Sequence, residues 1–210
     1  MARRGAYAKT AAQRAKIMGT AHSVFGRSGF RNGSLRKIAE EVGLSHGAVL
    51  HHFGSKQALL TAVLEDSDQK LAALFQEVAT RPLAAVAEVV NLFVAPNRPT
   101  SEWFITMAAE AVHPTHPAHA YFVRRYAWAR NYLTGILAAL AVDGALRPGM
   151  DPARMARMAI SLMDCLQVQW LYDEDSVNIA ADLAAFFQSI IEDEPWTVSI
   201  QPLIRSGDEG

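Results

Sequence analysis

Apolar residues recur along most of this chain at the three- and four-residue spacing of an amphipathic α-helix. The strict alternation of apolar and polar residues that marks a half-buried β-strand is not found between turn residues. The pattern therefore predicts an all-α fold. The expected helices run from about residue 10 to Gly29, over 34–42 and 45–52, from Ser55 toward Pro82, and near 82–94, 100–112, 117–143, 152–173 and 177–193.

Two short helices in the first sixty residues carry the most specific pattern. Ser34 and Ser45 each precede one of them, and a serine hydroxyl can accept a hydrogen bond from the free N–H groups of a first helical turn. Gly43 suits the left-handed residue that follows a helix, so that only Gly43 and Leu44 separate the two helices. Two short helices joined by a tight glycine turn predict a helix-turn-helix.

The domain organisation follows from the next segment. An apolar stripe continues from Ser55 without proline or glycine until Pro82, which predicts a single helix of about 24 residues, roughly 36 Å long. This helix is expected to join an N-terminal three-helix domain that contains the helix-turn-helix, residues 1–60, to a helical domain, residues 61–194. Residues 195–210 are expected to form an irregular tail. Because no flexible linker separates the domains, the helix is expected to transmit movement of the second domain to the first.

Charge divides the chain at the same place. The 210 residues include 20 Lys or Arg and 21 Asp or Glu, a net charge of −1. Residues 1–60 hold ten basic and two acidic residues, a net +8, whereas residues 61–210 hold ten and nineteen, a net −9. A basic head on an acidic body is expected where one end of a protein meets a polyanion such as DNA.

Other functional classes find less support in the sequence. The single cysteine, Cys165, excludes an intrachain disulfide framework and is expected to be a small buried hydrophobe in a reducing compartment. No apolar run approaches the ~18 residues of a membrane span, so we expect a cytoplasmic protein. Motifs for phosphate binding, paired-carboxylate chemistry or a Ser-His-Asp triad are not visible, and we expect neither a cofactor nor enzymatic activity.

The second helix of the predicted helix-turn-helix is a candidate for reading DNA. Base edges in the major groove are read by short side chains near the N-terminus of such a helix, and those residues here are Ser45, His46, Gly47 and Ala48. Arg36, in the preceding helix, can reach a guanine or a phosphate. The side chains of His51, His52 and Lys56 suit contacts to the DNA backbone. The alternative is a solvated basic face with ordinary helix caps.

The same segment resembles the N-terminal domain of tetracycline-repressor (TetR) family regulators over about residues 10–62. The resemblance rests on Ala21-His22-Ser23-Val24-Phe25, Gly29-Phe30, Ser34-Leu35-Arg36-Lys37-Ile38-Ala39, Val42-Gly43-Leu44-Ser45, Gly47, His52-Phe53 and Ser55-Lys56-Gln57-Ala58-Leu59. It implies a homodimer that binds a palindromic DNA operator and has a helical C-terminal domain with a small-molecule pocket. It also implies base-reading roles for Arg36, His46, Gly47 and Ala48, and backbone contacts from Ser34, His51, His52 and Lys56. One departure is Leu50, where the family usually has a tyrosine.

The C-terminal helices contain candidates for an effector pocket. Aromatic, flexible and a few polar side chains line ligand cavities, and the candidates of this kind are Trp103, Phe104, Met107, Trp128, Met163 and Gln167. Plain packing is the alternative for each of them. Glu110 falls on an apolar stripe, where it could meet a cationic effector, although an intramolecular partner such as Arg124 or Arg125 is the favoured interpretation. The expected effector is a small apolar or amphipathic molecule.

The helices expected near 152–173 and 177–193 are apolar around more than one face. A helix with one face in water needs apolar residues only on the opposite face. Such a pair could bury one face within the subunit and another against its twin. The residues assigned to this dimer interface are Met158, Leu162, Leu166, Trp170, Leu183, Phe187 and Ile190.

Two alternative functions remain open. His113, His116 and His119 recur every three residues, which suggests a metal-dependent enzyme, although Pro114 and Pro117 interrupt the helix that would align them. The chain could also be an architectural DNA-binding protein that responds to no ligand. The favoured interpretation is a homodimeric repressor that a small molecule releases from operator DNA.

Overall fold

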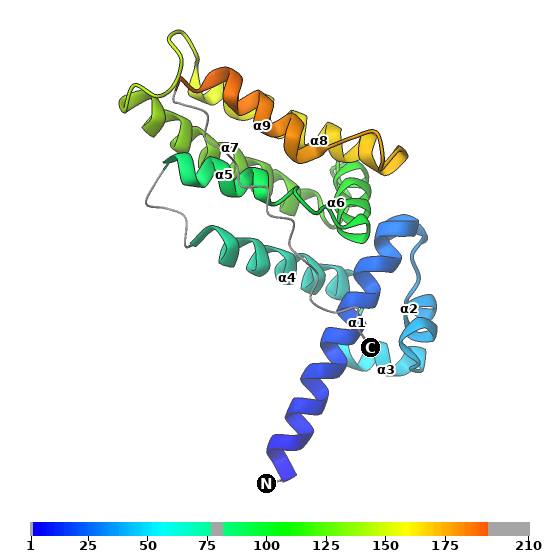
Figure 1. Cartoon of the computed structure of the whole chain (residues 1–210). Coiled ribbons are helices and arrows are strands. Elements are labelled where there is room, and N and C mark those ends of the chain that lie inside the picture. Colours follow the sequence, from blue (N-terminus) through cyan, green and yellow to red (C-terminus); the bar gives the residue numbers. More distant parts are fainter. Residues whose placement is uncertain (1, 77–81, 193–210) are drawn as a thin grey trace, which may run out of the picture. The chain divides into compact units, whose positions relative to one another are not determined.

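The computed structural model describes residues 2–76 and 82–192, and the prediction of an all-α fold is confirmed. The helices of these residues are α1 (Ala2–Asn32), α2 (Leu35–Val42), α3 (His46–Phe53), α4 (Lys56–Gln76), α5 (Pro82–Asn91), α6 (Arg98–Glu110), α7 (His119–Val142), α8 (Pro152–Tyr172) and α9 (Ile179–Ile190) (Figure 1). The predicted tail at 195–210 lies outside the described residues. None of the described helices combines the length and apolar character needed to cross a membrane.

The helices pack into two compact units. One contains residues up to 72 together with 98–123, and the other contains 73–97 together with the residues from 124 onward. Helix α6 thus belongs with the helix-turn-helix, because it packs along α1. The packing units therefore differ from the two domains predicted from the sequence, which divide at residue 60. That DNA binding resides in residues 1–60 stays a prediction.

In the first unit, α1 supplies the central apolar face. Ile17, Ala21, Val24 and Phe25 are fully buried, as the periodicity predicts. Trp103 of α6 stacks against Phe25, with ring centroids 6.4 Å apart. The large aromatic surface that is buried here explains why α6 is held against α1 rather than grouped with the later helices.

Helix α1 is longer than expected at both ends. It begins at Ala2 rather than near residue 10, consistent with alanines at 2, 6 and 8, which are strong helix formers. The expected stop at Gly29 is a kink: this residue has φ 73° and ψ 167°, and helical structure continues to Asn32. A positive φ favours glycine, so the sequence correctly indicated a break in helical geometry at Gly29. The break bends α1 but does not end it.

The second unit is a helical core formed by α5, α7, α8 and α9, in which α8 and α9 run side by side (Figure 1). Asp151 caps α8 by accepting a hydrogen bond from the backbone N–H of Arg154, and Pro152 occupies the first turn. Asn178 caps α9 in the same way. A single antiparallel bridge joins Leu146 to Ile191, which ties the loop after α7 to the end of α9.

Candidate functional site

The helix-turn-helix has the local structure that the sequence predicts. The hydroxyl of Ser34 accepts a hydrogen bond from the N–H of Lys37, and that of Ser45 accepts one from the N–H of Ala48, both at 3.1 Å. Gly43 has φ 79° in the left-handed region. The two starts and the turn between α2 and α3 are therefore confirmed, and each follows from a short polar side chain or a glycine at the required position.

Burial orients the two helices. Their buried apolar residues are Leu35, Ile38, Ala39, Val42 and Val49. The first turn of α3 faces outward: Ser45, His46 and Gly47 are exposed, and Ala48 is half-buried. An ideal Cβ placed on Gly47 would have only the Ser45 hydroxyl near it, at 4.0 Å. This turn is therefore an accessible surface with little side-chain bulk.

The other residues assigned to DNA contacts lie around this turn. Ser34, Arg36 and His51 are exposed, whereas His52 and Lys56 are half-buried. All of them belong to the first packing unit. Their contacts with DNA stay a prediction.

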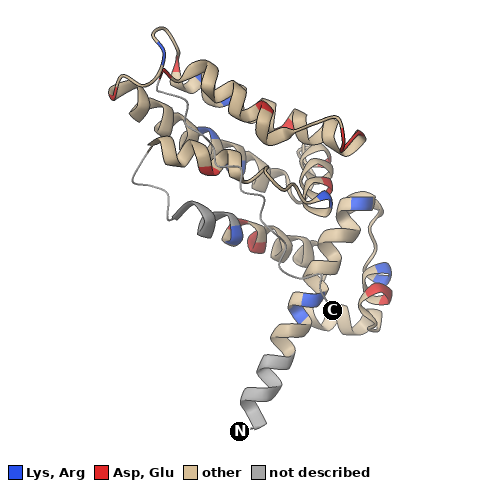
Figure 2. Ribbon diagram, viewed as in Figure 1, with Lys and Arg blue, Asp and Glu red and all other residues tan. Residues whose placement is uncertain are grey.

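Several basic side chains of this unit form ion pairs or hydrogen bonds within the protein. Figure 2 shows where the Lys and Arg residues lie on the helices. Arg27 forms an ion pair with Glu41 at 3.0 Å. Arg14 donates a hydrogen bond to the backbone carbonyl of His52, and Lys16 donates one of 3.1 Å to that of Val42. These three basic side chains already have partners within the protein. The net charge of the N-terminal segment therefore overstates the positive charge that is available to DNA.

Lys56 shows the same internal use. Its Nζ donates a hydrogen bond to the carbonyl of Arg31 at 3.2 Å and lies 4.4 Å from the ring centroid of Phe30. Burial lowers the pKa of Lys56, and the nearby Glu110 carboxylate opposes this effect. The neighbouring residue Ser55 caps α4 by accepting a hydrogen bond from the N–H of Ala58 at 3.0 Å. Lys56 thus ties the start of α4 to the end of α1.

Glu110 has an intramolecular partner, as expected, but the residues named for this role are wrong. Neither Arg124 nor Arg125 fills this role, because the carboxylate turns toward the kink in α1, where it accepts a 2.8 Å hydrogen bond from the backbone N–H of Phe30. Glu110 Oε2 also lies 3.4 Å from Nε2 of His116. Periodicity identified Glu110 as a polar residue on an apolar stripe, but it could not identify a backbone N–H as its partner.

Each of the three spaced histidines, His113, His116 and His119, contacts another residue of the segment 111–118. His113 Nδ1 contacts the Thr115 hydroxyl at 2.9 Å, and His119 Nδ1 contacts the carbonyl of Ala111 at 2.7 Å. His116 Nδ1 accepts a hydrogen bond from the N–H of Ala118, which leaves a proton for Nε2 on the side of Glu110. Burial lowers the pKa of His116, against the opposing effect of Glu110. Within the described residues, no three potential ligands are grouped so as to hold a metal.

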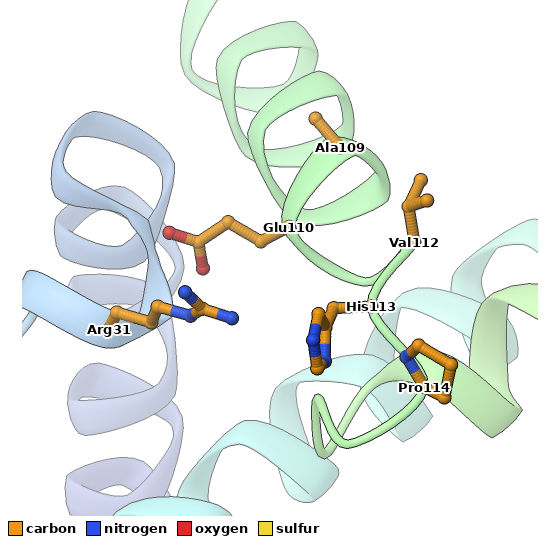
Figure 3. A pocket seen from close by; sticks show the side chains of 6 residues that line it. All are labelled: Arg31, Ala109, Glu110, Val112, His113 and Pro114. Atoms are coloured by element: carbon orange, nitrogen blue, oxygen red, sulfur yellow. The ribbon is translucent and has the colours of Figure 1, made fainter.

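A surface hollow of about 530 Å³ lies beside this loop. Its lining residues are Arg31, Ala109, Glu110, Val112, His113 and Pro114. Figure 3 shows the Arg31 side chain pointing toward Glu110 and His113 across the hollow. Among the residues assigned to an effector pocket, Glu110 alone contributes to this lining.

The other assigned effector residues fall in both units. In the first unit, Trp103 and Met107 are buried, and Phe104 packs against Phe122 with centroids 5.8 Å apart. In the second, Trp128 is 41% exposed and Gln167 is buried.

Two contacts describe the second group. Trp128 stacks on Tyr132 with centroids 5.4 Å apart and an interplanar angle of 15°. The amide of Gln167 donates a hydrogen bond to the carbonyl of Met163 at 3.2 Å. Their role in binding an effector stays a prediction.

A polar pair in the second unit was not identified from the sequence. The Tyr126 hydroxyl donates a 2.7 Å hydrogen bond to the carboxylate of Asp164, joining α7 to α8. Burial raises the pKa of Asp164, and burial together with this hydrogen bond raises that of Tyr126. The two residues are 38 positions apart, so only helix packing brings them together.

The assigned dimer residues divide into two groups. Within a single chain, Leu166, Trp170, Leu183, Phe187 and Ile190 are buried. Met158 is 50% exposed and Leu162 is half-buried, so these two retain surface for a partner. Cys165 is exposed, which corrects the expectation of a buried hydrophobe: it lies seven residues from Met158 on α8 and hence on a similar, outward-facing side.

Comparison with known proteins agrees with this geometry. Residues 17–63 match the family described as bacterial regulatory proteins, tetR family. The HTH-type transcriptional regulator UidR of Escherichia coli strain K12 is 34% identical over 64 residues, which are 30% of this chain and 33% of UidR. The alignment thus spans about a third of the length of that relative.

Two further similarities cover most of the chain. The HTH-type transcriptional repressor KstR2 of Rhodococcus jostii strain RHA1 is 23% identical over 197 residues, 86% of this chain and 90% of KstR2. A transcriptional regulator structure from Saccharomonospora viridis, in complex with choline, has a TM-score of 0.74 at 20% identity and covers 86% of this chain and 98% of that one. The latter shows a common fold. The capped helix-turn-helix and the family match together place residues 17–63 of this chain in the tetR family of bacterial regulatory proteins.

Proposed function

We propose that the protein is a homodimeric transcriptional repressor that binds palindromic operator DNA through α2 and α3 and is released by a small apolar or amphipathic effector. The observation that carries the proposal is the exposed first turn of α3, where His46 and Gly47 follow the capping residue Ser45. Small side chains there allow the helix to approach base edges, and His46 offers a donor or an acceptor.

DNA binding is tested with an operator selected from random double-stranded oligonucleotides by the wild-type protein. Arg36→Ala and His46→Ala are each expected to lower the preference for that operator over a scrambled sequence by about 1–3 kcal/mol. Arg147→Ala is the matched control, because Arg147 is an exposed arginine in a loop of the second unit. Equal preference in all four proteins would contradict the proposal.

A homodimer is favoured by the outward face of α8. Met158, Leu162, Cys165 and Tyr172 recur at spacings of three, four and seven residues, and Tyr172 is 89% exposed. Such a face can meet its own copy across a two-fold axis, where each residue serves both subunits. A dimer would carry two α3 helices, which must enter major grooves about one helical turn of DNA apart.

Release by an effector is supported by the choline complex of the similarly folded regulator, which shows a small molecule bound to that protein. The residues proposed for effector binding are Trp103, Phe104, Met107 and Glu110 in the first unit, and Trp128, Met163 and Gln167 in the second. Effectors that prefer one of two dimer conformations shift operator affinity by a coupling of about 1–3 kcal/mol, or some 5–150-fold.

Because coupling is reciprocal, operator DNA must weaken effector binding by the same factor. The measurement is a calorimetric titration of a compound that raises the melting temperature of the protein, with and without the selected operator. Identical compound affinity in both titrations would exclude the effector mechanism. It would instead favour a repressor that acts independently of a ligand.

A further inference from the structure

The C-terminal end of α3 is held by an arginine from another helix. Arg14 of α1 donates a hydrogen bond from Nη1 to the carbonyl of His52, and its Cζ lies 4.1 Å from the ring centroid of Phe53. These two residues are the last of α3. One side chain thus contacts both a backbone carbonyl and an aromatic face at the same helix end.

These two contacts restrict different movements of the helix. The last carbonyls of a helix lack partners within it and carry partial negative charge, so a guanidinium there is favourable. Its plane can stack on an aromatic ring while an edge N–H donates to the carbonyl, a combination that an ammonium group does not offer. The hydrogen bond opposes withdrawal of the end of α3, and the cation–π contact opposes rotation of Phe53.

Two neighbouring cations of α1 provide the comparison. Lys16 donates a hydrogen bond to the carbonyl of Val42, the last residue of α2. Arg27 pairs with Glu41 of α2 at the surface, where both side chains are substantially exposed. Among these cations, Arg14 is the one that reaches α3, the helix with the candidate base-reading turn.

We propose that Arg14 is a positioning residue for base recognition: by holding His52 and Phe53, it sets the angle at which α3 presents Ser45 to Ala48 to the major groove. This inference rests on the proposed function. An α-helix of eight residues is about 12 Å long, so a shift at one end is transmitted directly to the other. Base-edge hydrogen bonds depend on distance and angle, whereas the attraction of DNA for a basic surface does not.

The test compares Arg14→Gln with Arg27→Gln, which removes the same charge from the same helix. Affinities for the selected operator and for a scrambled duplex of equal length are measured over a range of salt concentrations, well below the melting temperature of each variant. Arg14→Gln is expected to lower the ratio of the two affinities at least tenfold. Affinity for the scrambled duplex and the salt dependence of binding should stay as in the wild type, and Arg27→Gln should keep the ratio within twofold.

Arg14→Lys separates charge from geometry. It keeps the cation but loses the planar guanidinium over the Phe53 ring, so only partial recovery of the ratio is expected. If Arg14 instead contacted a phosphate, both duplexes would be bound more weakly and the slope of log affinity against log salt would fall in magnitude by about 0.9. That result would overturn the inference, as would a lower melting temperature with an unchanged ratio.

The wild type and Arg36→Ala, measured in the same experiment, distinguish the two proposals. If the wild type prefers its operator and Arg36→Ala reduces this preference, a wild-type ratio in Arg14→Gln refutes the positioning role alone. If the wild type does not discriminate between the duplexes, both proposals are refuted.

Discussion

The carboxylate of Glu110, in the last turn of α6, accepts a hydrogen bond from the backbone N–H of Phe30, 80 positions earlier in the chain. Gly29 makes this approach possible, because an ideal Cβ at that position would lie 2.0 Å from Glu110 Oε1. The backbone N–H of Phe30, directly after the kink, thereby donates to a charged acceptor. One carboxylate fixes both the bend of α1 and the end of α6.

Removal of this carboxylate should destabilise the first unit. We expect Glu110→Ala to lower the free energy of unfolding by about 1–3 kcal/mol, because the Phe30 N–H loses its acceptor. Glu110→Gln retains an acceptor oxygen and should cost less. Urea denaturation measures both. Glu102→Ala is the control, since it breaks only the surface ion pair with Arg98 and should cost within about 1 kcal/mol. Equal losses at positions 102 and 110 would contradict the assignment.

Acid should destabilise the protein through His22. Its ring packs on Trp103 with centroids 4.9 Å apart, and burial, aided by Lys70 and opposed by Asp66, lowers the pKa of His22 to about 4. Unfolding restores the ordinary value of 6.5, so below that pH the unfolded chain binds the proton more readily. The neutral ring therefore contributes its full stability above pH 6.5, and this contribution is lost as the pH falls from 6.5 to 4.

The expected size and control follow from the same pKa. The loss is bounded by about 3 kcal/mol and should reach only about 1–2 kcal/mol, because part of the ring is solvent-accessible. His22→Phe keeps an aromatic ring beside Trp103 but cannot be protonated. Unfolding free energies of both proteins are measured between pH 7 and 4, and the difference between them isolates His22. Parallel curves would refute this prediction.

Two glycines of α1 should respond oppositely to the same substitution. A Cβ on Gly26 would lie 3.1 Å from both Cα and N of Trp103, whereas one on Gly19 would meet nothing within 4 Å. Gly19→Ala is therefore expected to stabilise the protein by about 0.5–1 kcal/mol through helix propensity. Gly26→Ala should destabilise it by about 1–2 kcal/mol, because the backbones of α1 and α6 must separate. Thermal unfolding of both variants checks this, and stabilisation by Gly26→Ala would contradict the close crossing.

A charge on the outward face of α8 should dissociate the proposed dimer. Met158→Glu would place an unpaired carboxylate in the interface, so a monomer is expected in analytical ultracentrifugation. Cys165 lies on the same face, and its thiol should react faster with a thiol reagent in this variant than in the wild type. Gln69→Glu, at an exposed site on α4, should remain dimeric. A dimer that persists in Met158→Glu would exclude this face as the interface.

Local structure was predictable wherever a single residue type determines it. The hydroxyls of Ser34 and Ser45 begin α2 and α3, the positive φ of Gly43 forms the turn, and Asp151 with Pro152 begins α8. Each of these signals acts within about four residues, which is the range over which a side chain can satisfy nearby backbone groups. The helix-turn-helix, and with it the resemblance of residues 17–63 to the tetR family, could therefore be inferred from the sequence.

Partners that are distant in the chain could not be predicted in this way. Periodicity shows that Glu110 shares a face with apolar residues, but not that α6 meets α1 or that a backbone N–H awaits the carboxylate. It identified Leu183 and Phe187 as apolar without deciding between a subunit core, where the structure buries them, and an interface. Charge counting likewise missed that Arg14 is used within the protein. Each of these outcomes depends on which helices become neighbours.

The open space around Gly47 means that a side chain at this position can change the proposed DNA-facing surface of α3 without changing the packing of the protein. Its outward direction has no neighbour closer than the hydroxyl of Ser45, and the buried side of α3 rests on Val49. Bulkier amino acids can therefore be introduced at position 47 without disturbing the interior, so a library at this single codon should yield folded proteins that differ in how closely α3 can approach DNA. Retargeting of the regulator can begin there.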